Sequence, residues 1–172
     1  MKKFPKPTSG YAPYFQNYLN QTPDDGNLLT HLKNIEKETA QLVRSLSEEK
    51  LLFRYAEGKW TIKDVLIHLA DAERIFAYRA LRFARADETN LSGFDENTYV
   101  PAAAANDRKI GDILKEMAAV RAASIAFCKS LDRKTYKRSG TSNGKPISVA
   151  ALVNLIYGHH RHHLNIIRER YL

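Results

Sequence analysis

The chain has 172 residues, of which 44% are hydrophobic and 27% are charged, and its formal net charge is +8 at pH 7. This length suits one domain with a sizeable core, and no apolar run approaches the roughly 20 residues of a membrane span. The basic start of the chain lacks the apolar segment of a signal peptide, and the single cysteine, Cys128, excludes an internal disulfide. We therefore expect a cytoplasmic protein. The charge permits an anionic substrate, whereas the scattered Lys and Arg residues disfavour a nucleic-acid partner.

The N-terminal residues differ in composition from the rest of the chain. Most of the prolines lie here, together with an aromatic cluster of Tyr11, Tyr14, Phe15 and Tyr18. This stretch is too aromatic for a disordered tail. We expect residues 1–26 to form an arm that packs on a single bundle domain at 27–172.

Apolar residues recur at helical spacing in four stretches, which predict helices at 27–46, 61–86, 107–131 and 148–171. The connection at 86–106 is long for a compact domain, and its Phe94 and Tyr99 are candidates for the wall of a pocket. The loop at 133–146 is rich in turn-forming residues and has room for a short hairpin. The pattern predicts an all-α protein, an antiparallel four-helix bundle with less than a tenth of its residues in strands.

Four of the six histidines lie within five consecutive positions of the last predicted helix. His159 and His163 continue a line of apolar residues, which runs through Val149, Leu152, Ile156 and Ile166. They therefore occupy positions that a bundle normally fills with Leu or Ile. One helical turn separates them, which is the spacing at which two imidazoles can hold one metal ion. His160 and His162 lie off this line, and we assign them to the flank or the surface.

Paired histidines on a helix are more often surface residues or hydrogen-bonded core groups than metal ligands. Two neutral imidazoles among aliphatic side chains would, however, need partners for four ring nitrogens, and a metal ion would satisfy one on each. His68 lies on or beside the apolar face of the helix at 61–86 and is the natural third ligand. Asp71 could orient the His68 imidazole, or it could pair with Arg74 or Arg79 on the surface.

The segment from Gly58 to Arg74, GKWTIKDVLIHLADAER, resembles the second-helix signature of the DinB/YfiT-like superfamily, and so do the Gly-Phe-Asp-Glu loop and the terminal Gly-His-His-Arg-His-His-Leu run. The resemblance spans nearly the whole chain. It implies an up-down-down-up bundle, often a homodimer, in which a divalent metal is held by His68, His159 and His163. Zinc and nickel are the ions best suited to these ligands. Many relatives have an acid at the position of His160, so we carry no role over to that residue.

The resemblance implies a metal-centred enzyme that acts on a small molecule, and we assign no catalytic side chain beyond a metal-bound water or thiol. Related bundles transfer low-molecular-weight thiols such as bacillithiol, isomerise substrates with mycothiol, or hydrolyse them. We expect S-transferase-like transfer of a thiol to an electrophile, with metal-dependent hydrolysis as the first alternative. The second alternative is a non-catalytic, stress-linked binding protein with a structural or vestigial metal site. A metal position that opens on a pocket favours an enzyme, whereas closure by a fourth protein ligand favours the binding protein.

Overall fold

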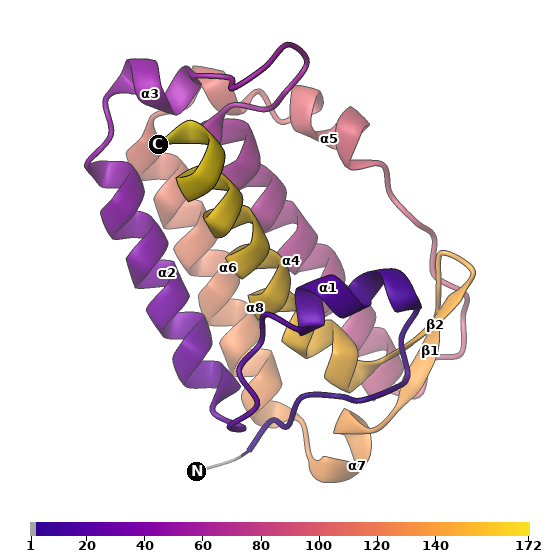
Figure 1. Ribbon diagram of the computed structural model, residues 1–172. Coiled ribbons are helices and arrows are strands. Elements are labelled where there is room, and N and C mark those ends of the chain that lie inside the picture. The colour runs from indigo at the N-terminus through magenta and orange to yellow at the C-terminus, as the bar shows by residue number, and fades with distance from the viewer. Residues whose placement is uncertain (1–2) are drawn as a thin grey trace.

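The computed structural model describes residues 3–172. Four long helices lie side by side (Figure 1), and they are α2 (Leu28–Arg44), α4 (Ile62–Ala84), α6 (Ile110–Ser130) and α8 (Val149–Ile166). Each predicted helix is present, and most of the observed ends lie a few residues inside the predicted ones. Within residues 3–172, no helix combines the length and the apolar character that crossing a membrane requires.

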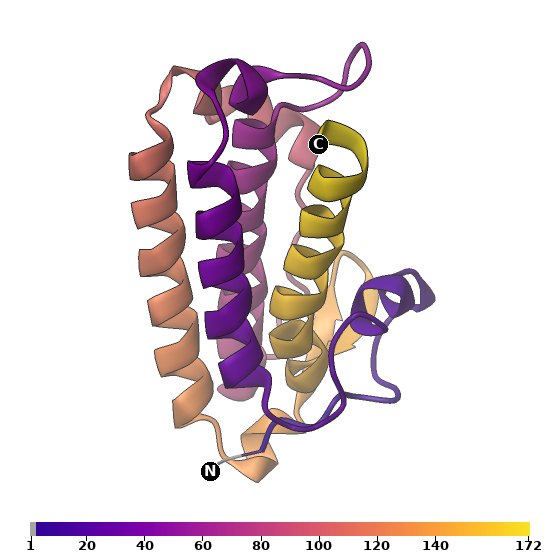
Figure 2. The ribbon, with the colours of Figure 1, turned by 60° about the vertical axis from the view of Figure 1, so that its left-hand side comes forward.

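The four helices follow an up-down-down-up order, as the two ribbon views show (Figures 1 and 2). Helix α4 packs against both α6 and α8, and α2 packs against the same two helices. Helices α4 and α6 run in the same direction, so the chain must return along the bundle between them. The connection at 85–109 makes this return, and it contains α5 (Glu96–Ala102) and the short helix η2 (Ala105–Asp107). The predicted bundle class is confirmed.

Short elements close the ends of the bundle. After α2 comes α3 (Glu48–Leu52), and after α6 comes α7 (Arg133–Tyr136). The predicted hairpin is present as two four-residue antiparallel strands, β1 (Ser139–Ser142) and β2 (Lys145–Ser148). The Leu91 backbone is hydrogen-bonded to Thr141 and Asn143, so the hairpin holds the long connection against the bundle.

The N-terminal segment lies across α8. It contains η1 (Pro13–Phe15) and α1 (Gln16–Leu19), and Leu19 is fully buried. Close approach depends on Gly158 of α8, where an added Cβ would lie 2.2 Å from the carbonyl oxygen of Tyr18. Any other residue at 158 would push the segment away from the helix.

The residues of α8 that face the core of the bundle differ in part from the predicted ones. From His160 onward, in α8 and in the following π-helical turn η3 (Ile167–Tyr171), the buried residues are His160, Leu164, Ile167 and Tyr171. Ile166, which we expected to be buried, is only half-buried. A repeat averaging 3.5 residues drifts around a straight helix of 3.6 residues per turn, so the predicted line leaves the core as the helix proceeds. His159 and His163 therefore contact α4 and the N-terminal segment, and His160 takes the core position.

Candidate metal centre

The imidazoles of His68, His159 and His163 converge, as predicted. The Nε2 atom of His159 lies 3.1 Å from that of His68 and 3.2 Å from that of His163. One ligand atom from each residue lies within 4.8 Å of the other two. Three nitrogens held about 2.1 Å from one ion, at angles of about 95–110°, would be about 3.1–3.4 Å apart. Two of the three spacings therefore match those expected for ligands of a single ion.

Burial keeps all three imidazoles neutral. It lowers the pKa of His68 to about 4, and together with the neighbouring His68 and His162 it lowers the pKa of His163 to about 3. The pKa of His159 is held well below its usual range by burial and by the other histidines. Neutral imidazole offers a lone pair to a metal, whereas imidazolium does not. Three converging Nε2 atoms cannot satisfy one another, because each ring has at most one N–H to donate. A divalent cation fits this donor set.

Aromatic side chains hold the imidazoles in place. The Trp60 ring packs on His68, with their centroids 4.8 Å apart. The rings of Tyr18 and Phe76 meet His159 in edge contacts at 5.4 Å and 5.7 Å. These contacts come from three parts of the chain, namely the N-terminal segment, the residues just before α4 and the middle of α4. They fix the rings without occupying the Nε2 atoms.

The three histidines line a cavity of about 380 Å³. Its wall also includes the aromatic residues Tyr14, Phe15, Tyr18, Trp60, Phe76 and Phe94 and the polar residues Arg79, Glu96, Ser142, Asn143 and Lys145. Within residues 3–172, no fourth histidine, cysteine or carboxylate joins the cluster. The side of the cluster that carries no protein ligand can therefore accept a molecule from the cavity.

Asp71 does not orient His68. Its Oδ1 accepts a hydrogen bond of 3.0 Å from Arg74 Nη1, and Arg74 also binds Glu116 of α6. Among the described residues no hydrogen bond joins Asp71 to His68. The Arg74 bridge to α6 holds the Asp71 carboxylate at the surface, so the alternative of a surface pair is the one observed.

The two predicted pocket residues have different places. Phe94 lines the histidine cavity. Tyr99 is 47% exposed and packs on Phe94, at a centroid distance of 5.4 Å. It borders a separate outer cleft between α4 and residues 89–94, so both predicted residues line a pocket, but Tyr99 does not line the histidine cavity. Helix α5 begins at Glu96, and its turns direct Tyr99 outward while Glu96 lies at the cavity.

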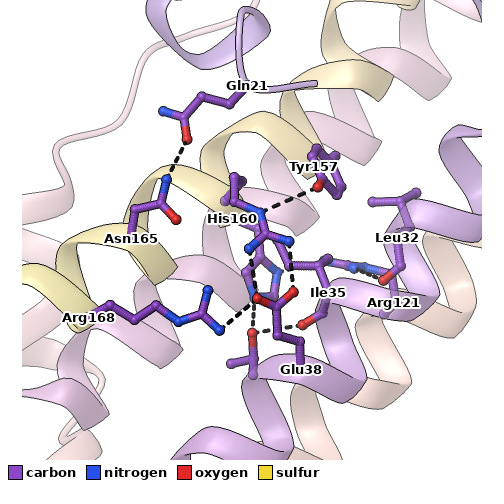
Figure 3. A network of polar contacts seen from close by, with 11 residues as sticks. Gln21, Leu32, Ile35, Glu38, Arg121, Tyr157, His160, Asn165 and Arg168 are labelled. Carbon is purple, nitrogen blue, oxygen red and sulfur yellow. Dashed lines mark hydrogen bonds and ion pairs between the residues drawn. The ribbon is translucent and has the colours of Figure 1, made fainter. Parts of the chain in front are cut away.

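The assignment of His160 to the flank or surface is also wrong, since this residue is only 2% exposed. Figure 3 shows its surroundings. The Nε2 atom of His160 lies 2.8 Å from Thr39 Oγ1, whose hydroxyl donates to the Ile35 carbonyl. The Nδ1 atom lies 3.0 Å from Nη2 of Arg121, which can only donate. His160 must therefore carry its proton on Nε2, donate to Thr39 and accept from Arg121.

Arg121 continues this network through the core. Its guanidinium donates to the Glu73 carboxylate at 2.8 Å and to the Leu32 carbonyl at 2.6 Å. A buried Arg and a buried Glu are stable only when they are paired in this way. His162, the other histidine off the predicted line, is half-buried, and its Nδ1 lies 3.5 Å from Gln21 Nε2. Neither His160 nor His162 belongs to the converging cluster.

Sequence reasoning missed several residues of the cavity wall. Arg79 was considered only as a surface partner for Asp71, yet it is buried and lines the cavity. Glu96 and Lys145 were not singled out. No spacing rule identifies them, because the connection at 85–109 and the hairpin reach the cavity only through tertiary packing.

The family model of the DinB superfamily matches residues 31–167. A protein of Oceanobacillus iheyensis named "Putative metal-dependent hydrolase OB0413" is 29% identical over 143 residues, which are 80% of this chain and 81% of the relative. The fold resembles that of YfiT from Bacillus subtilis, described as a probable metal-dependent hydrolase with an unusual four-helix bundle topology. The TM-score is 0.76 at 19% identity, over 83% of this chain and 82% of YfiT. The mycothiol-dependent maleylpyruvate isomerase has a TM-score of 0.59 at 12% identity, over 78% of this chain and 58% of the isomerase. The match to the family model spans most of the sequence, and the chain belongs to the DinB superfamily.

Proposed function

We propose that the chain binds one divalent metal ion through His68, His159 and His163 and hydrolyses a small-molecule substrate in the adjoining cavity. The observation that carries the proposal is the convergence of three neutral Nε2 atoms beside a cavity, with no fourth ligand among the described residues. A zinc or nickel ion would supply a Lewis acid there, able to polarise a carbonyl and to lower the pKa of water or of a thiol. The open side of the cluster argues against the non-catalytic alternative, which would close it.

The size of the cavity supports hydrolysis over thiol transfer. At about 380 Å³ it lies at the lower end of the range of small-molecule sites. It suits one small substrate and a water molecule better than a substrate together with a thiol cosubstrate. The names of two relatives point the same way, since both are called metal-dependent hydrolases.

Glu96 is the residue we propose to move the proton. It is the one carboxylate among the described residues of the cavity wall. A carboxylate beside the reacting group can accept a proton from the nucleophile and return it to the leaving group. Tyr18, Trp60 and Phe76 would position the substrate and exclude bulk water, because they surround the imidazoles.

Transfer of a low-molecular-weight thiol is the second candidate. The donor set is three neutral imidazoles, so the charge of a divalent ion would be uncompensated by the protein and would favour a thiolate as the fourth ligand. The shared fold with a mycothiol-dependent isomerase is consistent with this candidate.

One experiment separates the candidates. The purified protein is stripped with a chelator, reloaded with Zn²⁺ or Ni²⁺, and assayed against a panel of small esters and amides with and without bacillithiol. We expect one ion per chain and ester turnover without thiol, and both should be lost in His68→Ala. Turnover that requires the thiol would favour the second candidate, and tight metal without either activity would favour the non-catalytic one.

The role of Glu96 has its own control. Glu96→Gln should lower kcat by about 10²–10³ while the metal content stays the same. Glu88→Gln removes an exposed carboxylate from the same connection and should leave kcat unchanged. Equal kcat values in the two variants would remove Glu96 from the mechanism.

The homodimer implied by the family resemblance remains a proposal, as does the cytoplasmic location. Sedimentation velocity at micromolar concentration tests the first. A single species with the mass of one chain would contradict it.

A further inference from the structure

A buried cation lies in the wall of the histidine cavity. Arg79 is only 7% exposed, and it lines the same cavity as the three histidines. It follows His68 on α4 by 11 residues, which is close to three full turns, so the two residues share one face of the helix. Long side chains on a helix lean toward its N-terminus, which here is the direction of His68.

Arg79 has no anionic partner among the described residues. Its Nη2 donates to the Ser92 carbonyl at 2.8 Å, and its guanidinium lies 5.9 Å from the centre of the Phe94 ring. A guanidinium has five N–H donors, and this single bond uses one of them. Arg121, which is buried to a similar extent, is bonded to a carboxylate, a carbonyl and an imidazole. Arg121 therefore has acceptors for its guanidinium donors, whereas most of the Arg79 donors have no acceptor among the described residues.

The other charged groups of the cavity leave Arg79 unneutralised. Lys145 is exposed at the cavity, and Glu96 forms no ion pair with Arg79. Burial lowers the pKa of the Arg79 guanidinium and raises the pKa of the Tyr14 hydroxyl, and the nearby Arg79 charge opposes the rise at Tyr14. Tyr14 lines the histidine cavity, so the guanidinium lies on that side of α4. A desolvated, unpaired cation is costly, and an anion from the cavity would relieve that cost.

We propose that Arg79 binds a carboxylate group of the substrate, so that the bond to be broken lies at the three histidines while the carboxylate lies at Arg79. The location of the reaction rests on the proposed function, whereas the carboxylate site does not depend on a metal. A planar guanidinium matches the two oxygens of a carboxylate. Glu96 on the same wall disfavours a phosphate dianion, and among the described residues the wall offers only one buried cation.

The test measures carboxylate binding directly. Phenylacetate, phenylacetamide and inorganic phosphate are titrated into the full-length protein, both zinc-loaded and chelator-treated. Trp60 is the single tryptophan of the chain and lines the cavity, so its fluorescence reports binding there. Calorimetry reports binding anywhere. In the chelator-treated protein no metal can bind the carboxylate, so a failure of the proposed function leaves this test intact.

We expect phenylacetate to bind the chelator-treated protein about tenfold or more tightly than phenylacetamide, with a change in Trp60 fluorescence. Arg79→Met should abolish that preference, and Arg79→Lys should keep part of it, because the charge remains and the two-pronged geometry is lost. Arg85→Gln is the matched control, since it removes an exposed arginine at the end of the same helix, and it should keep the full preference.

Several results would overturn the proposal. One is equal affinity of the wild-type protein for the acid and the amide. Another is an acid preference that survives in Arg79→Met. A third is a calorimetric signal without a fluorescence change, which would place the anion in the outer cleft that Arg79 also borders with Arg82. Phosphate binding as tight as phenylacetate binding would show that carboxylate is not the group recognised. If Arg79→Met does not fold, the Arg79→Lys titration decides.

Discussion

His159 and His160 are neighbours on α8, both are buried, and their surroundings are opposite. Both ring nitrogens of His160 are used by Thr39 and Arg121. The Nε2 atom of His159 instead faces the Nε2 atoms of two other neutral imidazoles. Burial alone therefore does not separate a structural histidine from a candidate metal ligand. The distinction lies in whether the lone pairs have donors, because a folded core leaves few buried polar atoms without partners unless a ligand uses them.

The largest expected effect is a loss of stability of the metal-free protein in acid, because His68, His159 and His163 are held as neutral imidazoles. In the unfolded chain a histidine titrates near pH 6.5, whereas in the folded protein the pKa of His68 is about 4 and that of His163 about 3. The unfolded chain therefore binds more protons between these values. The stability of the metal-free protein should be highest above about pH 6.5 and should fall as the pH drops toward 4. The slope should reach up to about 1.4 kcal/mol per pH unit for each histidine.

Urea unfolding at a series of pH values measures this slope. Saturating Zn²⁺ should shift the loss of stability to lower pH, because the ion binds only deprotonated imidazole. His163→Ala removes one titrating group and should make the slope shallower. An unchanged slope in that variant would mean that the three converging histidines are not the source of the acid sensitivity.

Among single substitutions, the largest loss of stability is expected in the network of His160, Arg121 and Glu73, whose buried polar groups are paired. Arg121→Met leaves the Glu73 carboxylate buried without its partner and removes the donor to His160, and it should lower the free energy of unfolding by about 3–5 kcal/mol. Urea unfolding at pH 7 checks this. The double variant Arg121→Met, Glu73→Met removes the orphaned charge as well and should regain a large part of the loss. A loss below about 1 kcal/mol in Arg121→Met would mean that the Arg121–Glu73 pair does not hold the core together.

A substitution among His68, His159 and His163 should have the opposite effect, namely a large loss of metal affinity and a small loss of stability. His163→Ala should weaken zinc binding by about 10²–10³, if the roughly 10–16 kcal/mol of a zinc site is shared among four ligands. The metal-free bundle should lose less than about 1 kcal/mol, because His163 is half-buried and alanine suits a helix. Competition with a chelating dye measures the affinity. His162→Ala is the adjacent control and should keep the affinity, and full zinc occupancy in His163→Ala would remove this residue from the site.

The smallest effect is expected at Asp71. A carboxylate that oriented His68 would change metal affinity by about 10–100-fold when removed. Since Asp71 pairs with Arg74 instead, Asp71→Asn should change zinc affinity less than about twofold and stability by at most about 1 kcal/mol. A tenfold loss of zinc affinity would restore the sequence-based hypothesis.

The sequence predicted the bundle and the converging histidines because both depend on local periodicity. Spacing along α4 and α8 places His68, His159 and His163 on adjoining faces, and no long-range information is needed beyond helix pairing. The same reasoning failed at Ile166 and His160. A line that repeats every 3.5 residues drifts around a helix of 3.6 residues per turn, so His160 faces the core and Ile166 is only half-buried.

Arg121 and Arg79 escaped sequence reasoning for a different reason. Arginine in an amphipathic helix is usually solvated, and only the partner or the cavity across the interface reveals that these two are buried. The sequence did not indicate which pocket Tyr99 borders, because its position depends on α5, which begins within a connection that has no apolar repeat. Residues whose roles depend on contacts between distant segments are therefore the ones that a single sequence leaves undetermined.

Gly158 has a consequence for how this cavity can diversify. By letting the Tyr18 backbone rest against α8, it brings Tyr14, Phe15 and Tyr18 into the wall beside the histidines. These three residues precede position 31, where the match to the family model begins. The three histidines and part of the cavity wall therefore lie in separate stretches of the sequence. An exchange of the first two dozen codons would give the same three imidazoles a new wall, provided that position 158 stays free of a side chain.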